Sequence, residues 1–277
     1  MKLSEINGLL NMKVIGQSRA KKRLLATLYI NKNSRILLSG PSGCGKTYLI
    51  DSLADILGIR CCHIDASKLT QTGFAGNTIE DYISEFLNTV GGNLSVVEQS
   101  IIFIDEFDKI QSKKNDRVNS EIANIGVQYE LLKFFDGDEL VIEYNHRKTV
   151  INTSKMTVIC AGAFSNVGNL ISEKEDLVDA GFIEELAGRI NVYIPMAKLT
   201  REEMLRILEK KSTKFIGNIF TVCSALNEKI VLSNEEMYEI VSKCEESAFG
   251  VRHLDDLVYE KLIDKIYEIM EKNDVDM

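Results

Sequence analysis

One stretch decides the fold: Gly40-Pro41-Ser42-Gly43-Cys44-Gly45-Lys46-Thr47. It follows an apolar run, Arg35–Ser39, and precedes a helical pattern that begins at Tyr48. This is the pattern G-x-x-x-x-G-K-[ST] of a phosphate-binding loop that connects a strand to a helix. Glycines let backbone N–H groups surround phosphate oxygens, and the positive end of the helix dipole adds to the attraction. The sequence therefore predicts a nucleotide site in an α/β protein.

Specific roles in this loop follow from side-chain chemistry. Lys46 is expected to reach the β- and γ-phosphates of ATP, and the Thr47 hydroxyl is expected to bind Mg²⁺. The alternative is a glycine-rich turn before an ordinary helix, but the flanking strand and helix favour the nucleotide site. The other residues expected to line the ATP site here are Pro41, Ser42, Gly43, Cys44, Gly45 and Tyr48.

A second apolar run, Ser100–Glu106, ends in two acids. A strand that is apolar throughout is typical of a parallel sheet covered on both faces. Asp105 is expected to hold Mg²⁺, directly or through water, and Glu106 is expected to polarise the attacking water as general base. Buried strands often end in acids, so the assignment depends on the phosphate loop. Together the two motifs predict ATP hydrolysis.

Composition narrows the functional classes. The chain has 277 residues, 45% of them hydrophobic, and a formal net charge of −8. A general affinity for nucleic acid is disfavoured by this charge. No apolar run approaches the length of a membrane span, and the N-terminus lacks the apolar core of a signal peptide. The sequence therefore predicts a cytoplasmic protein that does not bind membranes.

Cysteine and histidine positions give no metal motif. The six cysteines are expected to be reduced thiols of a cytosolic protein, and the adjacent Cys61 and Cys62 would point to opposite faces of a strand. The three histidines lie far apart without ligand spacing, so a zinc site is not expected.

The pattern of secondary structure changes after Pro195. Before it, strands are expected at residues 35–39, 59–65, 100–106, 156–161 and 192–195, helices at 78–90 and 126–135, a loop at 111–119, and a hairpin around 145–148. After it, helical periodicity dominates, with capping boxes at Thr200-x-x-Glu203 and Ser233-x-x-Glu236. This predicts an α/β nucleotide-binding domain over residues 1–197 and a small helical domain over 198–277.

Further segments, taken in chain order, resemble those of one family: Val14–Lys21, Ile104–Ile110, Gly126–Lys133, Thr153–Phe164, Gly181–Arg189 and Phe249–Leu254. They are spread over nearly the whole chain, so the combination is more specific than any single motif. The chain resembles the AAA+ ATPases, and among them the ClpX family of protein unfoldases. The resemblance implies a P-loop NTPase fold, with a parallel sheet flanked by helices and followed by a small all-helical domain.

The resemblance also implies roles outside the phosphate loop. Arg189 would reach the γ-phosphate of a neighbouring subunit as an arginine finger, and Arg252 would touch the phosphates of its own subunit as sensor 2. Val14 and Ile15 would frame the adenine. Arg189 can instead be a surface arginine near a turn, Arg252 a domain-packing arginine, and the two apolar residues plain core.

A pore loop is implied by Gly73-Phe74-Ala75-Gly76. Phe74 and Ala75 would grip a polypeptide in the channel of a ring, although Phe74 can instead be a core residue under a loop. The basic turn at 145–148 is either a second pore loop or a solvated hairpin tip.

Three departures limit the resemblance. The chain begins almost directly at the adenine segment, without the family's zinc-binding N-domain. The connection from Phe164 to Gly181 lacks the loop that docks a partner peptidase, so partnership with such a peptidase is not expected. Ala163 and Phe164 offer no polar side chain at the sensor 1 position.

The leading prediction is an ATPase that assembles as a homo-oligomeric ring, with six subunits expected, and remodels or unfolds a protein client. The alternatives are a nucleic-acid-acting AAA+ loader or motor, which the acidic charge disfavours, and a nucleotide-controlled assembly switch without threading activity. A metabolic kinase would share only the phosphate loop.

Overall fold

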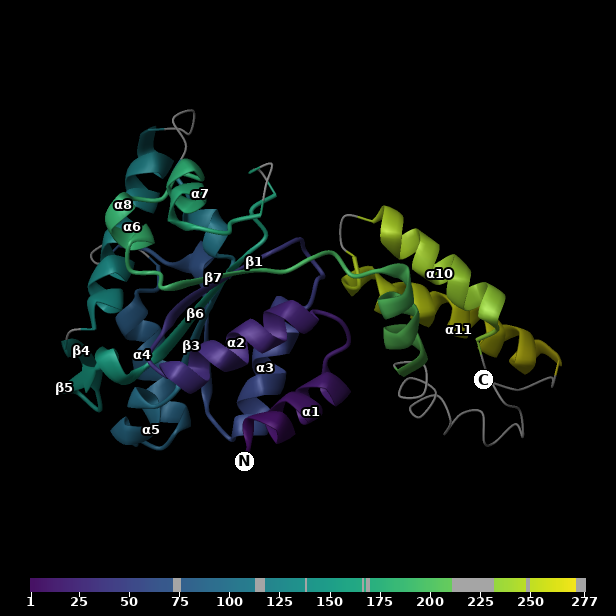
Figure 1. Ribbon diagram of the computed structural model, residues 1–277, viewed down its shortest axis with the longest axis horizontal. Helices are drawn as coiled ribbons and strands as arrows, with labels where there is room; N and C mark the ends of the chain where they lie inside the picture. Colours follow the sequence, from purple (N-terminus) through teal and green to yellow (C-terminus); the bar gives the residue numbers. More distant parts are fainter. Residues whose placement is uncertain are drawn as a thin grey trace. The chain divides into compact units, whose positions relative to one another are not determined.

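The computed structural model describes residues 1–71, 76–112, 118–137, 139–165, 167, 170–210, 232–247 and 250–272. The chain divides into two compact units (Figure 1). The first comprises Met1–Pro41 and Lys46–Ala197, and the second comprises Lys198–Met277 with Ser42–Gly45.

A parallel sheet forms the centre of the first unit. Its strands lie in the order β2-β3-β6-β1-β7, and every neighbouring pair is parallel. The three inner strands β3, β6 and β1 are almost entirely buried, as expected for strands covered on both faces, whereas the edge strand β2 is only partly buried. The strands are β1 (Arg35–Ser39), β2 (Cys61–Asp65), β3 (Ile101–Asp105), β6 (Thr157–Gly162) and β7 (Val192–Pro195). The predicted fold class is confirmed.

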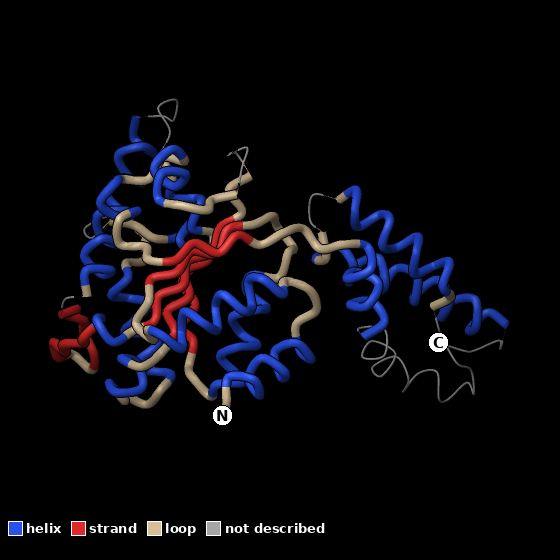
Figure 2. Tube along the Cα trace, viewed as in Figure 1, coloured by secondary structure: helices blue, strands red, loops and turns tan. Residues whose placement is uncertain are grey.

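Helices cover both faces of this sheet (Figures 1 and 2). The helices α1 (Leu3–Lys13), α2 (Ser18–Ile30) and α3 (Lys46–Leu57) pack together on one side. The other side carries α4 (Ile79–Thr89), α5 (Leu94–Glu98), α6 (Val118–Asp136), α7 (Lys174–Asp179) and α8 (Glu184–Ala187). Helix α4 shows why these elements form: Thr78 and Asp81 make a capping box, and the predicted apolar face is buried at Ile79, Ile83, Phe86 and Leu87.

The strand register places the functional loops at one edge. Ser39 at the end of β1 lies opposite Gly162 at the end of β6, and Asp65 lies opposite Asp105. In open parallel sheets, ligands bind outside the carboxyl ends of the strands. The phosphate loop, the acidic pair and the end of β6 therefore share the edge where a nucleotide is expected.

Two local predictions differ from the structure. The hairpin is formed by β4 (Glu139–Tyr144) and β5 (Arg147–Asn152), so its turn is only Asn145-His146, both with left-handed φ, as a type I′ turn requires. Helix α6 begins at Val118, inside the segment expected to be a loop. The helix therefore starts eight residues before the predicted start at Gly126, and Ile122 near its beginning is 61% exposed.

Within residues 198–277, the regular secondary structure that the structure describes is all helical. Residues 201–210 are helical, followed by α10 (Asn234–Glu246) and α11 (Arg252–Lys272). Both predicted capping boxes form: Glu203 N–H donates to Thr200 Oγ1 at 3.2 Å, and Glu236 N–H donates to Ser233 Oγ at 3.2 Å. The core of this unit includes Leu208, Ile240, Val241, Leu254, Val258 and Leu262. Among the described helices, none is both long and apolar enough to span a bilayer.

Candidate active site

The phosphate loop leaves β1 and enters α3. Gly43 and Gly45 have φ values of 74° and 95°, which residues with a Cβ atom adopt only at a steric cost. The Gly40 N–H donates to the Gly162 carbonyl at 3.2 Å, which ties the start of the loop to β6. Pro41 and Ser42 are half-buried, whereas Cys44 is buried. The two glycines thus give the loop backbone turns that residues with a Cβ atom rarely adopt.

The Lys46 ammonium folds over this loop. It donates to the Gly40 carbonyl at 2.6 Å and to the Pro41 carbonyl at 3.1 Å. These bonds hold a positive charge above the backbone that would cradle phosphates. An anionic ligand can therefore meet the loop N–H groups and the ammonium together.

Thr47 and Asp105 meet between α3 and β3. Thr47 Oγ1 donates to Asp105 Oδ2 at 2.8 Å, and Asp105 Oδ1 accepts from the Glu106 N–H at 2.9 Å. A hydroxyl and a carboxylate are the hard oxygen ligands that Mg²⁺ prefers, often with several waters retained. The donor set present at this point therefore fits Mg²⁺.

Glu106 has a strained backbone. Its φ of 53° and ψ of 32° lie in the left-handed region, which costs a non-glycine residue about 1–2 kcal/mol. The side chain is 41% exposed, and its Oε2 lies 3.9 Å from Lys109 Nζ. A carboxylate fixed one residue beyond Asp105 and open to solvent can accept a proton from water.

Asp108 is a buried residue to which the sequence analysis assigned no role. It lies in the 3₁₀ helix η2 (Phe107–Ile110), and its side chain is 3% exposed. Asp108 Oδ1 accepts from the Ala163 N–H at 3.0 Å, and Oδ2 pairs with Lys109 Nζ at 3.3 Å. The end of β6, which has no polar side chain at Ala163 or Phe164, is thus held by a carboxylate from the β3 side.

Replacing Asp108 by Ala is expected to lower the free energy of unfolding by about 1–3 kcal/mol, because the part-buried Ala163 N–H loses its acceptor. Asp108→Asn retains one acceptor oxygen and should lose less. Chemical denaturation of the nucleotide-free protein measures both. Wild-type stability in the Ala variant would show that this contact does not hold β6.

The segments expected to frame adenine come together. Val14 is 3% exposed and Ile15 is half-buried, in the connection between α1 and α2. Tyr48 of α3 is exposed, and its hydroxyl donates to the Lys13 carbonyl at 3.3 Å. The Val14 carbonyl accepts from the buried Lys21 Nζ at 2.9 Å. The first turn of α3 therefore lies beside the Val14 segment.

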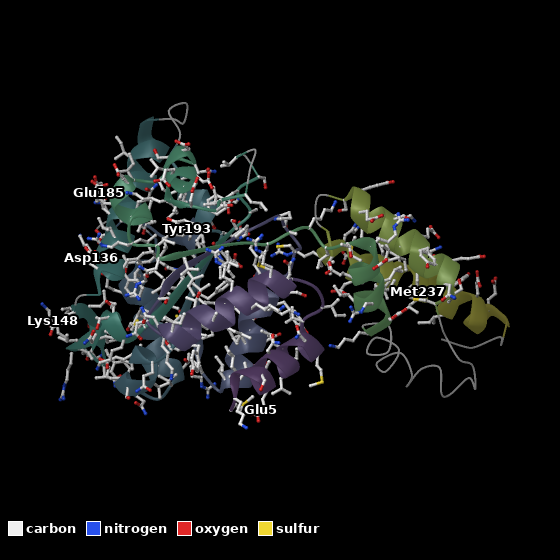
Figure 3. All side chains as sticks on the ribbon, viewed as in Figure 1. Glu5, Asp136, Lys148, Glu185, Tyr193 and Met237 are labelled. Carbon is white, nitrogen blue, oxygen red and sulfur yellow. The ribbon has the colours of Figure 1, made fainter. Side chains whose placement is uncertain are left out.

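Arg189 is exposed after α8 and forms an ion pair with Asp136 at the end of α6. Figure 3 labels Asp136 at the margin of the α/β unit, on the same side as Glu185 of α8. This partner was missed, because the two residues are 53 positions apart and no motif links them. The α/β unit thus presents the guanidinium at its surface.

The remaining predicted residues lie elsewhere or are not described. Arg252 is exposed at the first residue of α11, in the helical unit. Phe74 and Ala75 lie outside the described residues. The hairpin tip is solvent-exposed, with Lys148 pointing outward (Figure 3). The roles of these residues stay predictions.

The chain is similar in sequence to known proteins. Residues 31–193 match the AAA domain (Cdc48 subfamily). ClpX 2 of Wolinella succinogenes, an ATP-dependent Clp protease ATP-binding subunit, is 29% identical over 99% of this chain and 79% of its own length. The ClpX subunits of Treponema denticola and Borrelia duttonii are each 27% identical. They align with 95% and 92% of this chain, and with 76% and 72% of their own lengths.

A parallel sheet with a glycine loop after the internal strand β1, and with acids at the end of β3 on the far side of β6, defines a P-loop nucleotide-binding protein. Because the match over residues 31–193 covers more than half of it, the chain belongs to the AAA family. Within that family it is a ClpX-like AAA+ ATPase.

Proposed function

We propose that this ATPase assembles as a homo-oligomeric ring, with six subunits, and couples ATP hydrolysis to the remodelling or unfolding of a protein client. The observation that carries the hydrolytic part is the contact between Thr47 and Asp105, at 2.8 Å, with Glu106 next in the chain. It joins a phosphate loop to a pair of acids at one edge of the sheet. The ClpX relatives support the protein-handling part.

In this proposal the residues divide the work of hydrolysis. The loop N–H groups and Lys46 bind the phosphates of ATP, and Thr47 and Asp105 hold Mg²⁺, which neutralises phosphate charge when bound. Glu106 accepts the proton of the attacking water. Val14, Ile15 and Tyr48 line the adenine end of the site.

The proposed site is completed by a second subunit. Arg189 lies on the surface of the α/β unit, where it forms an ion pair with Asp136. A guanidinium displayed in this way can stabilise the charge that develops on the γ-phosphate of a neighbour. This arrangement makes hydrolysis depend on assembly, which a ring provides through repeated head-to-tail interfaces.

The helical domain, residues 198–277, would convert nucleotide state into movement. Arg252 at the start of α11 would contact phosphates of its own subunit, and Phe74 and Ala75 would grip the client. We place the protein in the cytoplasm, without a membrane or peptidase partner. These assignments rest on the resemblance to ClpX.

The proposal predicts that an unfolded polypeptide raises the steady-state rate of ATP hydrolysis several-fold. Permanently unfolded casein and single-stranded DNA, matched by mass, separate the alternatives when each is added to the full chain. Stimulation by DNA alone would favour a nucleic-acid motor. Nucleotide-dependent assembly without stimulation by either would favour a switch.

A further inference from the structure

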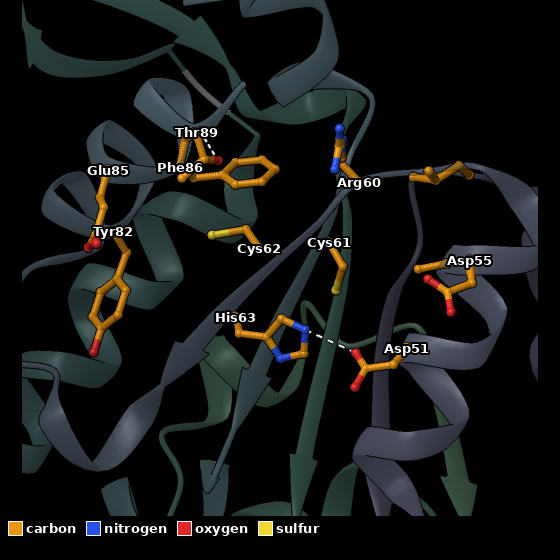
Figure 4. Close-up of a pocket in the computed structure, with 12 residues that line it drawn as sticks. Asp51, Asp55, Arg60, Cys61, Cys62, His63, Tyr82, Glu85, Phe86 and Thr89 are labelled. Carbon is orange, nitrogen blue, oxygen red and sulfur yellow. Dashed lines mark hydrogen bonds and ion pairs between the residues drawn. The ribbon is translucent and has the colours of Figure 1, made fainter. Parts of the chain in front are cut away.

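A second cluster of ligand-type side chains lies on the first unit, between α3 and the edge strand β2 (Figure 4). Asp51 comes from α3, and Cys61 and His63 come from β2. Figure 4 shows the Cys61 sulfur pointing toward the pair formed by His63 and Asp51. Nothing in the proposed ATPase cycle uses these three residues.

The topology explains why the sequence shows no ligand spacing here. Cys61 and His63 are two residues apart on one strand, so they share a face, while Cys62 between them points to the opposite face and is buried. The third ligand, Asp51, comes from the helix that packs on this face. The spacing between histidines in the sequence therefore does not reveal this cluster, which forms only because α3 packs against β2.

The geometry is close to that of a metal site. The ligand atoms of the three residues all lie within 4.8 Å of one another, and His63 Nε2 is 3.0 Å from Asp51 Oδ1. Around tetrahedral Zn²⁺, bond lengths of about 2.0–2.3 Å place ligand atoms about 3.3–3.6 Å apart. The His63 and Asp51 side chains are 48% and 47% exposed, so small side-chain rotations can bring the ligand atoms to the separations that Zn²⁺ requires.

We propose that Asp51, Cys61 and His63 form a binding site for Zn²⁺, with a fourth position open to solvent. One thiolate, one imidazole and one carboxylate are the ligand types that Zn²⁺ takes, whereas Mg²⁺ selects oxygen ligands. The thiolate and the carboxylate together balance the charge of a divalent cation. The three residues line a groove of about 660 Å³ together with Arg60 and Glu85, which leaves room for water at the fourth position.

The alternative is an ordinary surface ion pair beside a protonated thiol. Burial, with Asp51 and Cys62 nearby, raises the pKa of Cys61 to about 12. In the metal-free protein the thiol therefore keeps its proton, and a bound cation has to displace it. A metal would then link α3, which begins with Lys46 and Thr47, to the edge of the sheet.

Cobalt titration of the full chain tests the site, because Co²⁺ bound to thiolate gives a charge-transfer absorption that a site made of oxygen ligands does not give. The protein is first stripped with chelator and kept free of nucleotide. Wild-type protein should show this absorption at one equivalent of Co²⁺, and Zn²⁺ should displace it. Cys61→Ser should abolish the absorption, and His63→Gln and Asp51→Asn should each weaken Zn²⁺ binding at least tenfold.

Cys62→Ser is the matched control, because it removes the adjacent thiol on the opposite face and should leave the absorption unchanged. Circular dichroism checks that each variant is folded. Absence of the absorption in wild-type protein, or its persistence in Cys61→Ser, would overturn the proposal. The proposal would also be overturned if His63→Gln and Asp51→Asn both bound Zn²⁺ as tightly as the wild-type protein.

Discussion

Glu106→Gln is expected to lower the rate of ATP hydrolysis by about 10²–10⁴-fold while ATP still binds, because the amide cannot accept the proton of the attacking water. The Asp105–Thr47 contact and the Lys46 contacts do not involve the Glu106 side chain, so the binding part of the site stays intact. Steady-state hydrolysis and equilibrium binding of a fluorescent ATP analogue measure the two effects separately.

The backbone at Glu106 supplies a control for this experiment. Gln keeps the left-handed strain, whereas Glu106→Gly removes both the carboxylate and the strain, and should raise stability by about 1 kcal/mol. Both variants should be equally slow, although their stabilities differ. Turnover within a few-fold of wild type in either variant would remove Glu106 from the role of general base.

The features that the sequence predicted well are those encoded locally. Strands β1 and β3 have buried apolar centres, and the phosphate loop and the acids at the end of β3 are short motifs in a fixed context. The buried face of α4 repeats at helical spacing. The start of α6 shows the limit, because the polar residues before it predicted a loop and Ile122 near its beginning is exposed.

The features that could not be predicted depend on contacts between distant elements. Asp108 holds the Ala163 N–H across 55 positions, and Arg189 pairs with Asp136 across 53. Asp51 reaches the Cys61 face only because α3 packs there. None of these pairs has a spacing rule, since the fold alone brings them together.

Arg189→Ala is expected to reduce hydrolysis by about 10³–10⁵-fold, the effect of removing an arginine finger. The residue is 49% exposed, and its ion pair with Asp136 is worth at most about 1 kcal/mol, so folding should be unaffected. Asp136→Asn breaks the same pair and keeps the guanidinium, so it should retain most of the hydrolytic rate. A steady-state ATPase assay, with unfolding curves for both variants, distinguishes a finger from a structural arginine.

Mixing two inactive variants tests whether Arg189 acts on a neighbour. Consider a ring assembled from equal amounts of Arg189→Ala and Glu106→Gln subunits. The ATP site at a subunit interface is complete when an Arg189→Ala subunit supplies Glu106 and its Glu106→Gln neighbour supplies Arg189. Random assembly through head-to-tail interfaces makes about a quarter of these interface sites complete, so the mixture should regain about a quarter of wild-type hydrolysis. If both residues acted within one subunit, no subunit of the mixture would hold a complete site, and the mixture would stay as slow as its components. Recovery of hydrolysis on mixing therefore requires that the Arg189 guanidinium acts on the ATP site of the neighbouring subunit. If a mixture shown to exchange subunits did not recover hydrolysis, the proposed ring mechanism would be contradicted.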